Sequence, residues 1–324
     1  MEYITVSCGD TNGIGPEIAI KLLEKKFNHK IILSIPENIF YFYIKNINSK
    51  RNYFLIKGAF NEEAKRHNLV VNLLDNVTFE PGKPTKESGK ASIESINESL
   101  KLIDLGIASG IVTAPISKYA IKLAGNSFPG HTELIADRYG INIPVMTFIA
   151  PKFHVALVTI HEPIKNVSNL ITKDKLLNIV DILKQFLIND LRIKSPRIAV
   201  LGLNPHAGEN GAIGDEEINI INKVVEGDSS LFGPFVPDAY FGDKKFKNFD
   251  ITLGMYHDQV LIPFKYIAFD KGVNYTAGLP IVRTSPDHGT AYDIAGKMLA
   301  NANSMIYAFN VALRIIKNRR NVSK

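Results

Sequence analysis

The feature that most constrains the fold is an alternation along the chain between short β-rich runs and longer helical runs. Strands are predicted at residues 3–8, 31–35, 110–113, 145–150, 154–160, 197–203, 250–255 and 266–269. Apolar side chains at helical spacing predict helices at residues 88–105, 173–190 and 301–316. A further helix is expected to open at Pro16 and Glu17, because proline suits a first helical turn and an early carboxylate suits the helix dipole. This alternation predicts an α/β fold with a largely parallel sheet.

Length and composition narrow the class of protein. A chain of 324 residues is longer than one compact core usually needs, so two domains are expected. The formal net charge of +6 is compatible with anionic small molecules, and no basic tract argues for nucleic acid. Cys8 is the single cysteine, which excludes an internal disulfide. With no apolar run of roughly 20 residues and no export signal, we expect a cytoplasmic protein without a membrane partner.

Three histidines come directly after predicted strands. His161 follows the strand at 154–160, His206 follows 197–203, and His257 follows 250–255. Sites in α/β proteins lie beyond the carboxyl ends of the strands, so these imidazoles can converge there. Three neutral imidazoles suit a divalent metal and leave positions open for water or substrate. Their wide spacing forms no local metal motif, and the alternative is three hydrogen-bonded loop histidines or acid–base groups.

Two cations and an amide lie among glycine-rich loops further along the chain. These residues are Lys265, Asn274 and Arg283. Together with backbone donors they would suit a phosphate monoester, which an arginine can bind through two hydrogen bonds. The alternative is that the two cations only solvate their loops.

A glycine-rich turn, Gly-Asp-Thr-Asn-Gly-Ile-Gly-Pro, occupies residues 9–16 after the first predicted strand. Only one residue separates Gly13 from Gly15, so the turn is not the G-x-G-x-x-G of a standard Rossmann fingerprint. It also lacks the Gly-Lys-Ser/Thr of a Walker loop. We therefore expect a tight turn that positions the following helix.

Residues 288–297 resemble the adenosine-binding loop of the isocitrate and isopropylmalate dehydrogenases, which bind a dinucleotide without a standard Rossmann fingerprint. The resemblance implies cofactor contacts at His288, Gly289 and Asp293. Asp293 can accept hydrogen bonds from a ribose diol and would repel a 2′-phosphate, which favours NAD over NADP. The alternative is a capped helix with Asp293 merely exposed.

Further blocks narrow the resemblance, at residues 9–18, 130–133, 204–209, 256–259, 274–280 and 283–291. With them, the chain from residue 7 to about residue 296 resembles the 4-hydroxythreonine-4-phosphate dehydrogenase family of vitamin B6 biosynthesis. The resemblance implies two α/β/α domains flanking a cleft, like those of the isocitrate and isopropylmalate dehydrogenases. We expect one domain at 1–128 with 285–324 and the other, which includes the dimerisation surface, at 129–284. The resemblance also implies a homodimer with the active site at the subunit interface.

The resemblance also assigns roles, residue by residue. The implied ligands of a divalent metal (zinc, magnesium or cobalt), completed by the partner subunit, are His161, His206 and His257. The implied substrate contacts are His131, Thr132, Lys265, Asn274 and Arg283. Asp238 and Asp258 are further polar neighbours of the substrate.

The implied reaction is the NAD-dependent oxidation of 4-phosphooxy-L-threonine to 2-amino-3-oxo-4-phosphooxybutanoate. This β-keto acid loses carbon dioxide to give 3-amino-2-oxopropyl phosphate, on the route to pyridoxine 5′-phosphate. A sister dehydrogenase of a phosphorylated threonate or erythronate would share nearly every residue named above. A phosphate-dependent acyltransferase of related fold would need neither the three histidines nor the 288–297 loop. A catalytically silent metabolite-binding protein is disfavoured, because the whole polar constellation is present.

Overall fold

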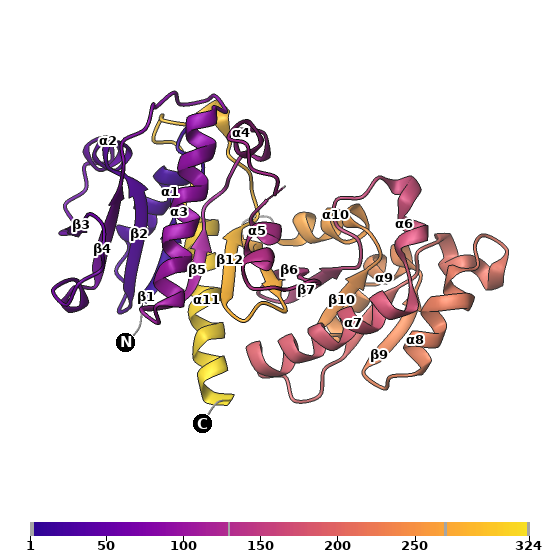
Figure 1. The fold of residues 1–324 in the computed structure, drawn as a ribbon. Helices are drawn as coiled ribbons and strands as arrows, with labels where there is room; N and C mark the ends of the chain where they lie inside the picture. The colour runs from indigo at the N-terminus through magenta and orange to yellow at the C-terminus, as the bar shows by residue number, and fades with distance from the viewer. Residues whose placement is uncertain (1–2, 129, 269–270, 323–324) are drawn as a thin grey trace. The chain divides into compact units, whose positions relative to one another are not determined.

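The computed structural model describes residues 3–128, 130–268 and 271–322, and it divides into two compact units (Figure 1). Unit 1 comprises Met1–Gly140 and Pro280–Ile316, and unit 2 comprises Ile141–Leu279 and Lys317–Lys324. Helices pack on strands in both units, so the predicted α/β class is confirmed. Within the described ranges, no helix is both long and apolar enough to cross a lipid bilayer.

Unit 1 is built on six parallel strands. Their order is β3 (Phe54–Ile56), β4 (Leu69–Leu74), β2 (Lys30–Pro36), β1 (Tyr3–Ser7), β5 (Ala108–Thr113) and β12 (Val282–Pro286). The helices assigned to it are α1 (Gly15–Leu23), α2 (Glu37–Ile47), α3 (Lys86–Asp104), α4 (Lys118–Leu123), α5 (His131–Arg138) and most of α11 (Asn303–Val322). Helix α3 lies across β1, β2 and β5 (Figure 1). Strand β1 is buried along its whole length and β2 from Ile31 onward, as is typical of parallel strands covered on both faces.

Local sequence signals explain where two of these helices begin. Helix α1 has Pro16 in its first turn, as predicted, and the buried Glu17 forms an ion pair of 2.7 Å with Lys21. Helix α3 begins two residues before the predicted start because Thr85 caps it. The Thr85 hydroxyl accepts from the backbone N–H of Ser88 at 3.1 Å, and the Ser88 hydroxyl accepts from that of Thr85 at 3.2 Å.

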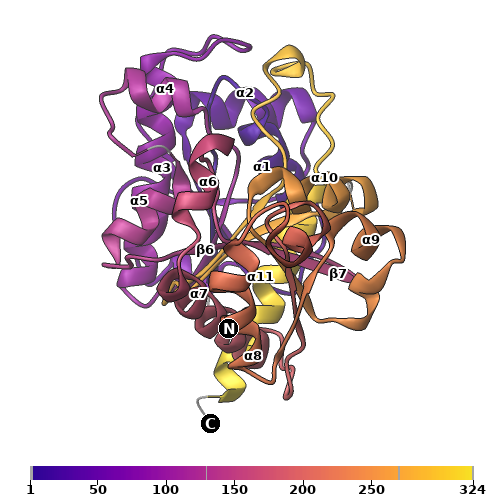
Figure 2. The same ribbon diagram turned by 90° about the vertical axis from the view of Figure 1, so that its right-hand side faces the viewer.

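Unit 2 contains a mixed sheet. Its strand order is β11 (Val273–Ala277), β6 (Val145–Ala150), β7 (Phe153–Leu157), β10 (Ile251–Gly254), β8 (Ile198–Leu201) and β9 (Leu231–Phe235). Strand β6 runs antiparallel to β11 and β7, and the other neighbours are parallel. The helices are α6 (Ile164–Leu170), α7 (Lys173–Gln185), α8 (Asn222–Glu226), α9 (Pro237–Gly242) and α10 (His257–Ala268). Helices α7 and α8 lie side by side (Figures 1 and 2).

One predicted strand is wrong. Residues 266–268 belong to helix α10, and Phe269 lies outside the described residues. The buried residues Val260, Leu261 and Phe264 form the face that packs α10 on the sheet, while Tyr266 is 92% exposed. A short apolar run does not by itself distinguish a strand from the last turn of a helix.

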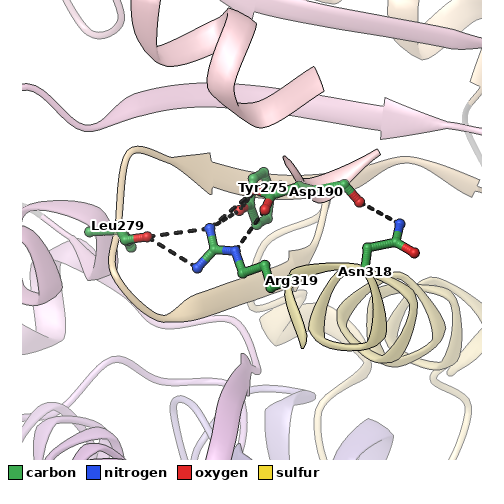
Figure 3. A network of polar contacts seen from close by, with 5 residues as sticks. All are labelled: Asp190, Tyr275, Leu279, Asn318 and Arg319. Atoms are coloured by element: carbon green, nitrogen blue, oxygen red, sulfur yellow. Dashed lines mark hydrogen bonds and ion pairs between the residues drawn. The ribbon is translucent and has the colours of Figure 1, made fainter. Parts of the chain in front are cut away.

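The end of the C-terminal helix is anchored in unit 2 by a network of polar contacts (Figure 3). Arg319 donates from Nε to Asp190 Oδ1 at 2.6 Å and from Nη2 to Asp190 Oδ2 at 3.1 Å. The same Nη2 donates to the hydroxyl of Tyr275 at 2.9 Å, and this hydroxyl donates to Asp190. The guanidinium also donates to the carbonyl of Leu279. A buried carboxylate therefore has both a cation and a hydroxyl as partners, and the network holds β11 through Tyr275.

Candidate active site

His161, His206 and His257 come after β7, β8 and β10, which are neighbouring strands of unit 2. Strand β10 lies between β7 and β8 and is parallel to both. Carboxyl ends of adjacent parallel strands meet at one edge of a sheet, and His161, His206 and His257 follow this edge. The ring centroids of His161 and His257 are 6.1 Å apart. The chain thus brings two of the three imidazoles together directly.

Two polar residues that sequence reasoning did not single out tie these strand ends together. Thr159 donates from its hydroxyl to the carbonyl of Met255 at 2.7 Å, which joins the ends of β7 and β10. Gln259 accepts from the backbone N–H of Met255 at 2.7 Å and donates to the carbonyl of Gly202 at 2.7 Å, which joins β10 to β8. Gln259 directly follows the His257-Asp258 pair in the sequence. Its place in the block at residues 256–259 is the sequence feature from which its role near the site could be predicted.

A buried glutamate supports the loop that carries His206. Glu217 accepts from the backbone N–H groups of Leu203 and Asn204 at 2.7 and 2.8 Å, and from the side-chain amide of Asn204 at 2.9 Å. Residues 206–210 all have positive φ, and four of them are not glycine. Such a run is costly for L-residues, so the anchor at Glu217 helps to hold an unusual loop conformation.

These donors fit part of a metal site. His257 Nδ1 lies 2.7 Å from Asp258 Oδ1, a carboxylate contact of the kind that orients a ligating imidazole. His161 and His206 are exposed, as is Asp238 in α9. Within the ranges that the structure describes, no three His, Cys, Asp or Glu side chains form a group able to hold a metal ion. The chemistry of the three imidazoles suits a divalent cation.

Unit 1 contains a buried cation near a half-buried histidine, His131, whose Nε2 atom is buried. Arg283 lies on β12 and is only 3% exposed. It donates from Nε and Nη2 to the hydroxyl of Thr113, at the end of β5, at 3.2 and 3.0 Å. His131 and the buried Thr132 open helix α5. Nε2 of His131 is buried and has no hydrogen-bond partner among the residues described. A buried guanidinium that carries its positive charge is a suitable receptor for an anion.

Electrostatics keep this imidazole neutral. Burial, followed by the positive charge of Arg283, holds the pKa of His131 well below its usual range, while a hydrogen bond to the backbone of Ala114 acts the other way. Burial lowers the pKa of Arg283 to about 10, and the carboxylate of Glu133 opposes that shift. Near pH 7 the guanidinium is therefore charged and the imidazole is neutral, with one ring nitrogen as a hydrogen-bond donor and the other as an acceptor.

Lys265 and Asn274 lie in unit 2. Lys265 is exposed in the last turn of α10, the helix that begins at His257. Asn274 is half-buried on β11, beside Tyr275 and opposite Phe148 of β6. Helix α10 packs on β7 and β10, and β11 belongs to the same sheet of unit 2.

The predicted adenosine loop joins β12 to α11 in unit 1. His288 and Gly289 are exposed. Asp293 is also exposed and lies in a short 3-10 helix, Tyr292–Ile294, which follows Ala291 in the left-handed region at φ 42°. These three residues are accessible to a ligand from solvent.

Comparison with known proteins identifies the family of the chain. The sequence profile of the family described as "Pyridoxal phosphate biosynthetic protein PdxA" matches residues 22–312. The chain belongs to the PdxA family. A relative from Bacteroides thetaiotaomicron, named 4-hydroxythreonine-4-phosphate dehydrogenase, is 40% identical over 98% of this chain and 89% of its own length. The crystal structure of 4-hydroxythreonine-4-phosphate dehydrogenase from Klebsiella pneumoniae superimposes with a TM-score of 0.82, at 33% identity, over 97% of this chain and 98% of that chain. The predicted membership of this family is confirmed.

Proposed function

We propose that this chain is an NAD-dependent, divalent-metal-dependent dehydrogenase that oxidises the C3 hydroxyl of 4-phosphooxy-L-threonine. The product, 2-amino-3-oxo-4-phosphooxybutanoate, then loses carbon dioxide to give 3-amino-2-oxopropyl phosphate for the synthesis of pyridoxine 5′-phosphate. Membership of the PdxA family supports the substrate and the pathway. The protein acts in the cytoplasm as a homodimer, with the active site at the subunit interface.

The buried Arg283, whose charge acts on the half-buried His131, is the single observation of this structure that carries the proposal. A buried guanidinium suits the phosphate of the substrate, with His131 and Thr132 as neighbouring contacts. Lys265 and Asn274 are the further substrate contacts, with Asp238 and Asp258 as polar neighbours. Fixing the phosphate orients the reacting carbon toward the nicotinamide, which lowers the entropic part of the barrier.

In this proposal, His161, His206 and His257 are the metal ligands, and the partner subunit completes the coordination of the metal. The exposure of His161 and His206 in a single chain supports this division. A divalent cation held there would supply Lewis-acid chemistry, lowering the pKa of the substrate hydroxyl and polarising the ketone. His288, Gly289 and Asp293 would bind the adenosine half of NAD, which would supply the hydride acceptor.

The direct test follows NADH absorbance with purified protein, a divalent metal and 4-phosphooxy-L-threonine. We expect NADH to form with this substrate and only slowly with phosphorylated threonate or erythronate at equal concentration. A higher kcat/KM with either acid would assign the chain to the sister dehydrogenase. No NADH with any of the three substrates would reject the dehydrogenase proposal.

Replacing His206 with alanine is expected to lower metal-dependent turnover to less than about one hundredth of the wild-type value, because a metal ligand is lost. Metal affinity, measured by calorimetry, should fall with it, while the far-UV circular dichroism stays unchanged. The exposed His29 provides a matched control, since His29→Ala removes an imidazole far from these strand ends in the sequence. Wild-type turnover of the His206→Ala variant after chelation would exclude the metal role.

A further inference from the structure

The glycine-rich turn at residues 9–16 contacts the predicted adenosine loop within unit 1. The hydroxyl of Tyr292 donates to Asp10 Oδ2 at 2.8 Å, and the backbone N–H of Ile14 donates to the carbonyl of Thr290 at 2.9 Å. A Cβ at Gly13 would lie 2.9 Å from that carbonyl oxygen, so a side chain there would push the two segments apart. The turn therefore supports residues 290–292 as well as the start of α1.

Asp10 is a fully buried carboxylate whose donors are neutral groups. Its Oδ1 accepts from the backbone N–H of Asn12 at 2.9 Å, and its Oδ2 accepts from the hydroxyl of Ser88 at 3.3 Å as well as from Tyr292. Burial raises the pKa of Asp10, and the hydrogen bonds from Tyr292, Asn12 and Ser88 oppose that shift. Burying a charge is costly, so each of these donors matters, and Tyr292 makes the shorter of the two side-chain contacts.

Asn12 supports a second segment that contacts the far end of the same loop. The side-chain Oδ1 of Asn12 accepts from the backbone N–H of Glu80 at 2.9 Å. The backbone carbonyl of Asn12 accepts from the backbone N–H of Gly82 at 2.8 Å. Between them, Pro81 lies so close to Gly296 that a Cβ on this glycine would be 3.1 Å from the ring. The turn at 9–16 thus supports the loop at 290–292 directly and at 296 through residues 80–82.

We propose that Asp10 is a positioning residue for NAD, which it does not touch. Through the hydroxyl of Tyr292 it fixes the short helix that carries Asp293, and so presents the Asp293 carboxylate to the adenosine ribose. Tyr292 and Asp293 are consecutive residues of one 3-10 turn, so displacement of the first moves the second. The inference rests on the proposed role of residues 288–293 in binding NAD.

The test measures the Kd of NAD by calorimetry, without substrate, in Asp10→Asn, Tyr292→Phe and the double variant. We expect each single change to raise this Kd about tenfold, the value of one hydrogen bond to a charged group. The double variant should be no weaker than the weaker single variant, because both changes remove the same contact. The KM for 4-phosphooxy-L-threonine and the kcat at saturating NAD should stay unchanged. Ser88→Ala is the matched control, since Ser88 donates to the same carboxylate but not to the loop, and it should keep the wild-type Kd.

The positioning role is overturned if Tyr292→Phe binds NAD within twofold of wild type, or if the two single effects multiply in the double variant. Tyr292→Phe loses only a hydroxyl and decides the question even if Asp10→Asn does not fold. Asp293→Ala separates the two levels of the argument. A weaker NAD complex in Asp293→Ala, with no change in Tyr292→Phe, rejects the role of Asp10 alone. Unchanged NAD affinity in Asp293→Ala rejects the proposed adenosine site and this inference together.

Discussion

Replacing Arg283 with alanine is expected to raise the KM for the phosphorylated substrate at least about 30-fold, because removing one partner of a buried, hydrogen-bonded charge pair costs roughly 2–5 kcal/mol. Arg283 is almost completely buried and next to His131, so solvent cannot replace its charge. Steady-state kinetics at saturating NAD measure the effect. The Kd of NAD alone should stay at its wild-type value.

A matched arginine controls for the loss of charge. Arg314 is exposed on α11 in the same unit, and Arg314→Ala should leave the KM within about twofold, since an exposed charge contributes little. Arg283→Ala should also raise the pKa of His131 toward its usual range, because the positive charge of Arg283 helps to depress it. NMR titration of His131 reports this change. A wild-type KM in Arg283→Ala would remove Arg283 from the phosphate site.

Replacing Arg319 with alanine is expected to lower the free energy of unfolding of unit 2 by about 3 kcal/mol, the usual scale for breaking a buried ion pair from one side. The change leaves the Asp190 carboxylate, whose side chain is 4% exposed, without its cation. It also removes one of the two partners of the Tyr275 hydroxyl (Figure 3). Urea unfolding followed by circular dichroism measures the loss.

Two further variants define the origin of this loss. Combining Arg319→Ala with Asp190→Asn should recover part of the stability, since a neutral amide costs less to bury than an unpaired carboxylate. Lys317→Ala, which removes an exposed cation from the same end of α11, should change stability by less than about 0.5 kcal/mol. Equal losses in Lys317→Ala and Arg319→Ala would show that the pair with Asp190 is not the source.

Local patterns in the sequence predicted the elements near the candidate site well. The strands before His161, His206 and His257 are found within a few residues of the predicted bounds. The supports at Thr159, Gln259 and Glu217 were not predicted, because their partners lie on other strands or loops. Hydrophobic periodicity reports which face of an element is buried, but it does not report which distant backbone group a polar side chain will meet.

The sequence by itself determined the α/β class and the place of His161, His206 and His257 after the ends of strands. These properties depend on local spacing, which each segment carries alone. Only the tertiary structure decided that β10 inserts between β7 and β8, that Arg283 is buried beside His131, and that Asp10 meets Tyr292. Strand order and burial arise from packing between residues that are far apart in the chain, and no short segment contains that information.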